Sequence, residues 1–163
     1  KFIYGSDKKP LPFGRLVSNP QQYKAEYSRL NKFGLLNVCP APMQQEAVSD
    51  KNLTTEQENV IAILEKLRVN YEASRHQKET WNKVKDLILT NFKTRLERVL
   101  TASQSIEYLI PCGRLAESYF SLIEDDLQLK SEVINGIPHP SFNQWQTSEE
   151  MGQLKKVLAS HTC

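Results

Sequence analysis

The segment that decides the fold is TTEQENVIAILEKLRVNYEASRHQKETWNKVKDLILTNFKTRLERVL, residues 54–100. It lies inside a longer stretch, from Leu53 to Ile110, that contains neither glycine nor proline. Glu, Lys, Leu, Arg and Gln dominate it, and these residues have high helix propensity. Because the two strongest helix breakers are absent, we expect this segment to be largely helical and to form the core of the fold.

A capping-box pattern marks the start of the first core helix. Thr55 stands at the cap position and Glu58 follows three residues later, the spacing at which each side chain can bond the other residue's backbone amide. Apolar residues then recur three or four positions apart, which is typical of an amphipathic helix. This spacing predicts a broad buried face formed by Val60, Ile61, Ile63, Leu64, Leu67 and Tyr71.

Two interpretations of the remaining segment stay open, because Ser74, Lys78 and Lys85 interrupt the apolar rhythm. One is a helical hairpin that breaks within Glu72–Thr80, where Ser74 to Gln77 would cap a second helix. The other is one continuous helix of about 45 residues, the length at which coiled coils become common, with self-association through residues 55–100.

The apolar arc of the second half favours the hairpin. It is broader than a two-stranded seam and comprises Val84, Leu87, Ile88, Leu89, Leu96 and Leu100. The lack of glycine or asparagine at the break counts against the hairpin, since connections between antiparallel helices usually contain one.

The flanking regions contain all the glycine and proline residues of the chain, which interrupt regular structure. Residues 1–18 read as an extended segment, Asn19 and Pro20 as the cap and first residue of a short helix to about Lys32, and residues 35–50 as a loop. Leu35 to Cys39 is the one short apolar run that could form a strand.

Toward the C-terminus, Pro111 should end any helix before it, and a further core helix is expected from Leu115 to about Leu129. Asn135-Gly136 predicts a turn, and a capped pattern at Thr147 predicts a last short helix.

Together these signals predict an all-α fold, a helical bundle of four to six helices with an extended N-terminal arm. Residues 1–53 would supply the arm, one short helix and a loop, and residues 54–129 the helical core. Residues 130–163 would add a turn and a short C-terminal helix, packed as one domain with the core. A chain of 163 residues is long enough to bury such a core without disulfides or metals.

Composition restricts the partners. The net charge is only +2, from 21 basic and 19 acidic residues, so no strong field would hold the chain to nucleic acid or to an anionic membrane. The chain begins at Lys1 without a signal-peptide pattern, and no apolar run approaches the length of a membrane span. We expect a soluble piece of a larger intracellular protein, nuclear or cytoplasmic, with no membrane partner.

Cysteine usage supports the intracellular assignment. Cys39, Cys112 and Cys163 are odd in number and form no CxxC pair, so reduced thiols are expected. The alternative is a secreted helical protein with one Cys39–Cys112 disulfide, which the glycosylation sequon at Asn52 would suit.

No pattern in the sequence indicates catalysis. Walker, GxGxxG, HExxH, GxSxG and EF-hand patterns are all missing, so we predict neither an enzyme nor a cofactor. Cys112, near a possible helix start, has no identifiable base and reads as a small core residue.

Metal binding is not indicated either. His76, His139 and His161 are not spaced as paired zinc ligands, and the run Glu124 to Asp126 lacks the alternating oxygen ligands of a calcium loop. That run reads as a solvated helix face.

The side chains that best suit a binding role are of two kinds. Basic residues support the second hypothesis, a nucleic-acid-associated domain. At about 100° per residue, however, they spread around a helix rather than forming a single stripe. They are Arg75, Lys78, Lys83, Lys85, Lys93, Arg95 and Arg98.

Aromatic residues outside the central helices carry the leading hypothesis, because such rings often anchor protein interfaces. They are Phe2, Tyr4, Phe13, Tyr23, Tyr27, Phe33 and Trp145, although the same rings could pack into the protein's own core. We therefore expect a non-catalytic protein–protein interaction or scaffold module.

Overall fold

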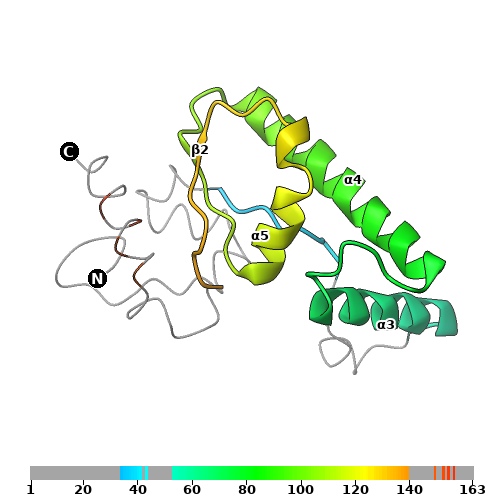
Figure 1. Ribbon diagram of the computed structural model, residues 1–163. Coiled ribbons are helices and arrows are strands. Elements are labelled where there is room, and N and C mark those ends of the chain that lie inside the picture. The colour runs from blue at the N-terminus through cyan, green and yellow to red at the C-terminus, as the bar shows by residue number, and fades with distance from the viewer. Residues whose placement is uncertain are drawn as a thin grey trace. The chain divides into compact units, whose positions relative to one another are not determined.

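The computed structural model describes residues 34–41, 43 and 53–139, together with residues 149, 152, 154 and 156 (Figure 1). The chain divides into two compact units, Asn37–Gly136 and a second unit made of Lys1–Leu36 with Ile137–Cys163. The first unit contains almost all of the described residues. The predicted arm and its short helix fall on residues 1–33, outside the described part of the chain.

Helix α3 spans Thr55–Val69 and begins one residue earlier than the sequence pattern suggested. The cap is Thr54, whose hydroxyl accepts from the Gln57 amide at 3.3 Å, while the Gln57 side chain accepts from the Thr54 amide at 2.9 Å. The capping box is therefore real but shifted, because glutamine can complete it as well as glutamate.

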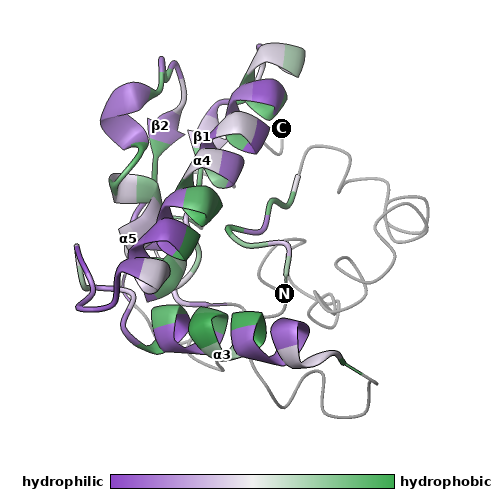
Figure 2. Ribbon diagram, turned by 90° about the vertical axis from the view of Figure 1, so that its right-hand side faces the viewer, coloured by the Kyte–Doolittle hydropathy of each residue, from purple (hydrophilic) through white to green (hydrophobic). Residues whose placement is uncertain are grey.

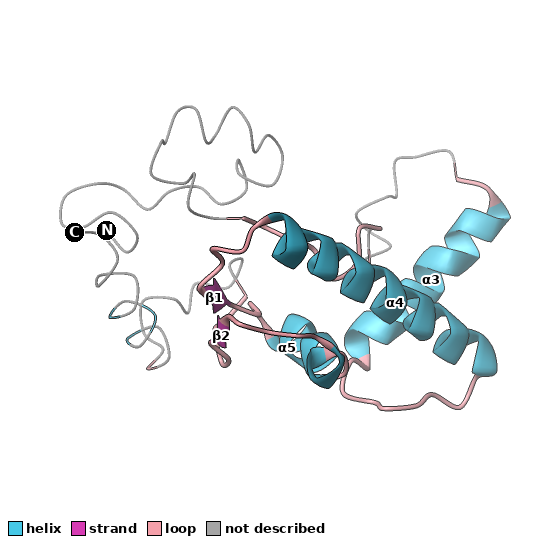
Figure 3. Ribbon diagram, turned by 90° about the horizontal axis from the view of Figure 1, so that it is seen from above, coloured by secondary structure: helices cyan, strands magenta, loops and turns pink. Residues whose placement is uncertain are grey.

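Helix α4 spans Glu79–Ala102, so the predicted break between two helices is confirmed. The break begins at Asn70, just before the predicted window, and the continuous helix of the alternative interpretation is not present. The predicted cap within Ser74 to Gln77 is wrong: α4 begins after Lys78, whose side chain makes no capping hydrogen bond. Figures 1 and 3 show α4 crossing α3 rather than running alongside it.

A buried asparagine on α4 holds the connection between the two helices. Asn82 accepts from the His76 amide at 2.7 Å and donates to the His76 carbonyl at 3.0 Å, closing a ring with the loop backbone. Asn82 is only 8% exposed, so water does not replace these bonds easily. A side chain of α4 thus satisfies the backbone hydrogen-bonding groups of a loop that contains no glycine.

The core of this unit is narrower than the apolar arcs of the sequence suggested. From α3 it takes Ile61, Leu64 and Leu67, and from α4 Ile88, Phe92 and Leu96. Figure 2 shows hydrophobic bands alternating with hydrophilic ones along both helices. Val60, assigned to the buried face, is exposed, and Leu87 is 70% exposed. Crossing helices bury only the positions near the crossing, which explains the difference.

A small parallel sheet follows α4. Strand β1, Tyr108–Leu109, pairs with β2, Glu132–Val133, and the Glu132 amide donates to the Glu107 carbonyl at 2.8 Å. Parallel strands need a crossover, and residues 110–131 supply it. The predicted strand at Leu35 to Cys39 is wrong, since these residues form no regular element.

The crossover contains helix α5, Arg114–Ser121, and the 3-10 helix η3, Glu124–Asp126. Gly113 precedes α5 with a φ of 89°, a conformation that glycine adopts without strain. The helix expected to reach Leu129 ends at Ser121, and Glu124–Asp126 form the 3-10 helix η3 instead, a tighter turn that is common at the end of an α-helix.

These findings correct the fold class. Within the described residues there are three α-helices, one 3-10 helix and a two-stranded parallel sheet, so the all-α bundle of four to six helices is wrong. The sequence pattern identified the helices but not the two-residue strands, which are too short to show an alternating pattern. Of the predicted C-terminal helix, the structure describes only scattered positions; Gly152, Leu154 and Lys156 are helical.

Replacing Asn82 with alanine tests the attachment of the loop. Asn82→Ala leaves the partly buried His76 amide without its acceptor, so we expect the free energy of unfolding to fall by about 2 kcal/mol. Urea denaturation followed by circular dichroism measures the change. The matched control is Asn91→Ala on the exposed face of the same helix, which removes only an exposed hydrogen bond from Arg95 Nε (2.7 Å), so a change of about 0.5 kcal/mol or less is expected. Equal effects of the two substitutions would contradict this account.

Candidate functional site

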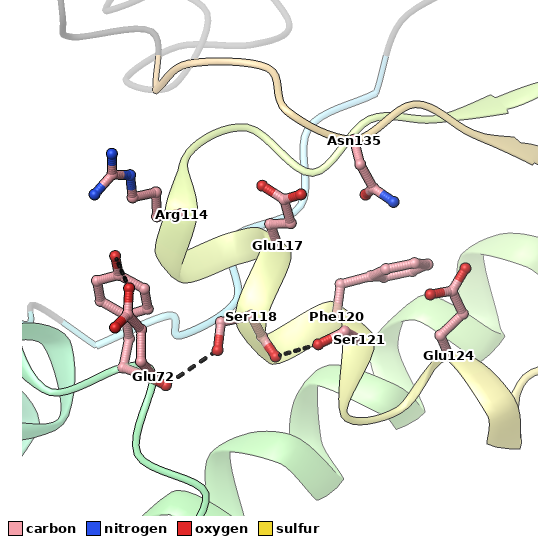
Figure 4. A pocket seen from close by; sticks show the side chains of 9 residues that line it. Glu72, Arg114, Glu117, Ser118, Phe120, Ser121, Glu124 and Asn135 are labelled. Carbon is pink, nitrogen blue, oxygen red and sulfur yellow. Dashed lines mark hydrogen bonds between the residues drawn. The ribbon is translucent and has the colours of Figure 1, made fainter.

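A surface cavity of about 360 Å³ lies beside α5 in the unit Asn37–Gly136. Figure 4 shows α5 crossing this cavity, with Glu72 on one side and Glu124 and Asn135 on the other. Its lining combines two aromatic rings with polar and charged groups: Tyr71, Glu72, Arg114, Glu117, Ser118, Phe120, Ser121, Glu124 and Asn135.

Helical periodicity places four of these side chains together. Arg114, Glu117, Ser118 and Ser121 are three, four and seven residues apart on α5, so they share one face of the helix. Phe120, which is buried, supplies apolar surface from the same helix. This helical spacing was visible in the sequence, although nothing there indicated that the face borders a cavity.

Hydroxyl groups fix the walls of the cavity. Ser118 Oγ donates to the Tyr71 carbonyl at 3.1 Å, which ties α5 to the loop after α3. The Tyr71 hydroxyl donates to Glu72 Oε1 at 2.9 Å, and Ser121 Oγ donates to the Ser118 carbonyl at 2.9 Å. Both serine hydroxyls are thus bonded to backbone carbonyls and neither is paired with a base.

The charged groups of the lining are not paired with one another. Glu117, Glu124 and Arg114 make no side-chain hydrogen bond or ion pair with any described residue. The lining contains three carboxylates, those of Glu72, Glu117 and Glu124, and one guanidinium, so it carries a net charge of −2. In a chain with a net charge of +2, this is a local excess of negative charge.

A buried lysine stabilises the loop that carries Tyr71 and Glu72. Lys85 is only 3% exposed, and its Nζ donates to the Ala73 carbonyl at 2.6 Å. The same Nζ lies over the Tyr119 ring, 5.4 Å from its centroid, where the ring face attracts a cation. Burial lowers the pKa of Lys85, and the nearby Asp86 carboxylate opposes this effect.

Two further polar atoms in the unit are buried. The Tyr119 hydroxyl and His76 Nε2 have no hydrogen-bond partner among the described residues. Burial raises the pKa of Tyr119 to about 12, with a smaller contribution from Cys39. Burial and the Lys85 charge both lower the pKa of His76. Both side chains are therefore held in their neutral forms at neutral pH.

The two cysteines that the structure describes, Cys39 and Cys112, are free thiols of low reactivity. No disulfide joins Cys39 to Cys112 in the structure. Burial raises the pKa of Cys39 and raises that of Cys112 to about 11, so neither forms much thiolate at neutral pH. Cys112 stands two residues before α5, where the helix dipole would favour a thiolate, but burial outweighs that effect.

Several of the basic residues considered for nucleic-acid binding are buried or bonded to other groups of the protein. Lys85 is buried, and Arg95 donates to the Val38 carbonyl at 2.8 Å. Lys93 pairs with Asp126 at 2.9 Å, a hydrogen bond that raises the pKa of Lys93. The helix surface therefore offers fewer unpaired cations to phosphates than the sequence suggested.

The seven aromatic residues predicted to bind a partner all lie outside the described residues. They are Phe2, Tyr4, Phe13, Tyr23, Tyr27, Phe33 and Trp145. Sequence reasoning missed the cavity residues instead, because Tyr71, Glu72 and Asn135 join the α5 face only through the fold.

Neither a metal-ligand cluster nor a membrane-spanning helix is present among the described residues. In that part of the chain, no three His, Cys, Asp or Glu side chains come together in a way that would hold a metal ion. None of the described helices is both long enough and apolar enough to cross a membrane.

Comparison with known proteins adds no assignment. No family model matches the chain, and no curated protein or solved structure is significantly similar to it.

The raised pKa of Cys112 predicts a loss of stability at alkaline pH. The ordinary pKa of the thiol is 9.0, and in the folded protein it is about 11. Between these two pH values the folded protein keeps the Cys112 proton, whereas the unfolded chain has released it. The unfolded state then binds fewer protons, so the free energy of unfolding falls as pH rises through this window. Cys112→Ala removes this contribution, and the stability difference between wild type and variant should narrow from pH 9 to pH 11 in urea titrations. A difference that stays constant with pH would contradict the prediction.

Proposed function

We propose that this chain is a non-catalytic protein-binding module of a larger intracellular protein, and that it receives its partner at the cavity beside α5. The observation that carries the proposal is the lining of that cavity, where aromatic surface and unpaired charged groups lie on a fixed backbone. Such a mixture of apolar area and orienting polar groups is typical of recognition sites.

The roles of the hydroxyl groups support binding over catalysis. Ser118 and Ser121 donate to backbone carbonyls, so their hydroxyls hold the cavity wall together rather than standing beside a base. A nucleophilic serine needs a base within hydrogen-bond reach. The neighbouring carboxylates, Glu117 and Glu124, can bind a cationic group without any change in covalent bonding.

One exposed apolar side chain adjoins the lining residues in sequence and adds an anchor. Leu122 follows the lining residue Ser121 and is 47% exposed. Large side chains of this kind contribute to interfaces when a partner covers them. A cavity of about 360 Å³ is small, so it suits a few side chains of a partner segment better than a whole cofactor.

The thiols support the intracellular part of the proposal. Cys39 and Cys112 are free, which suits a reducing compartment, and the secreted alternative would have joined them.

Site-specific crosslinking tests the proposal. The photo-reactive amino acid benzoylphenylalanine replaces Leu122 in one variant and Leu87 in a control, and both proteins are irradiated in living cells. Leu87 is the more exposed of the two, so random encounters would favour the control position. We expect one discrete protein adduct from position 122, and saturable binding of that protein to the purified chain. Equal labelling at both positions, or adducts with nucleic acid alone, would contradict the proposal.

A further inference from the structure

We infer that the occupant of the cavity is an extended, basic segment of another protein, whose lysine or arginine side chains meet the carboxylates of Glu117 and Glu124. This inference rests on the proposed function and adds the chemistry of the partner.

Charge complementarity is the first argument. Glu117 and Glu124 lie one on α5 and one on η3, at separate places in the lining, and neither carboxylate forms an ion pair with any described residue, Arg114 included. Glu72, from the loop after α3, adds a third carboxylate, which the Tyr71 hydroxyl orients. Carboxylates in such an open cavity attract cations from solution and steer their approach.

The separation of the charges favours a peptide over a metal ion. The carboxylates come from a loop, an α-helix and a 3-10 helix, and they do not converge as metal ligands within the described residues. The Arg114 guanidinium in the same lining carries donors that can bond the backbone carbonyls of an extended peptide. The apolar residues of an alternating basic and apolar segment would also cover the exposed Leu122.

The walls are fixed before the partner arrives. Ser118 attaches the Tyr71 backbone to α5, and Lys85 attaches the Ala73 backbone to α4. Both bonds hold the loop that carries Glu72. A site whose backbone is already in place loses less conformational entropy on binding, so a short segment can bind measurably.

Fluorescence polarisation with synthetic peptides tests the inference. The probes are three fluorescein-labelled peptides of equal length, in which leucine alternates with arginine, glutamine or glutamate. We expect the arginine peptide to bind the full chain and the other two to bind weakly or not at all. Affinity should fall as ionic strength rises above about 0.1 M, since partly exposed charges are screened there.

Matched charge variants locate the site. The double variant Glu117→Gln, Glu124→Gln should weaken binding of the arginine peptide about tenfold. The control double variant Glu58→Gln, Glu97→Gln removes the same total charge from exposed positions on α3 and α4, and should bind like the wild type. Circular dichroism verifies that both variants are folded.

Three results would overturn the inference. One is equal binding of the arginine peptide to both double variants, and another is no binding of that peptide at low salt. The third is a different occupant, shown by calcium titration heats or by self-association of the chain that the Glu117→Gln, Glu124→Gln variant abolishes. If crosslinking at position 122 still captures a protein while the peptide tests fail, the proposed function stands and only the basic chemistry of the partner is wrong.

Discussion

The structure of residues 53–136 depends on one constraint: the loop between α3 and α4 must be closed without glycine or proline. Side chains of α4 supply what the loop backbone lacks, Asn82 by bonding His76 in both directions and Lys85 by bonding the Ala73 carbonyl. Burying an ammonium group is costly, and here a backbone carbonyl, the face of Tyr119 and the charge of the Asp86 carboxylate offset part of the cost. The lowered pKa of Lys85 reflects the part of that cost that is not offset.

The closure of this loop also positions part of the cavity lining. Tyr71 and Glu72 line it and belong to the loop that Lys85 and Asn82 hold in place, while Ser118 joins this loop to α5. The lining that we propose receives a partner is therefore built from one helix face and one attached loop. Loosening the attachment would move two lining residues, so the proposal implies that the stability of the loop and binding at the cavity are coupled.

Local signals in the sequence predicted the local features. The capping pattern located the start of α3 to within one residue, and the interrupted apolar rhythm indicated the break before α4. Non-local features were out of reach: Lys85 looked like a surface cation that interrupts an apolar stripe, and only the packing of Tyr119 and Ala73 around it explains its burial. The two strands form only because they pair with each other across a crossover of more than twenty residues, and a local sequence pattern cannot predict such pairing.

The most direct test of this account is the rate at which an amine-reactive acetylating reagent modifies Lys85 compared with Lys83. The two lysines are neighbours on α4, one buried and one exposed. A lowered pKa alone would make Lys85 the faster of the two, because more of its amine would be unprotonated. The account predicts the opposite: burial should slow Lys85 by about tenfold or more, as quantified by mass spectrometry of the folded protein. Equal rates, or faster modification of Lys85, would contradict it.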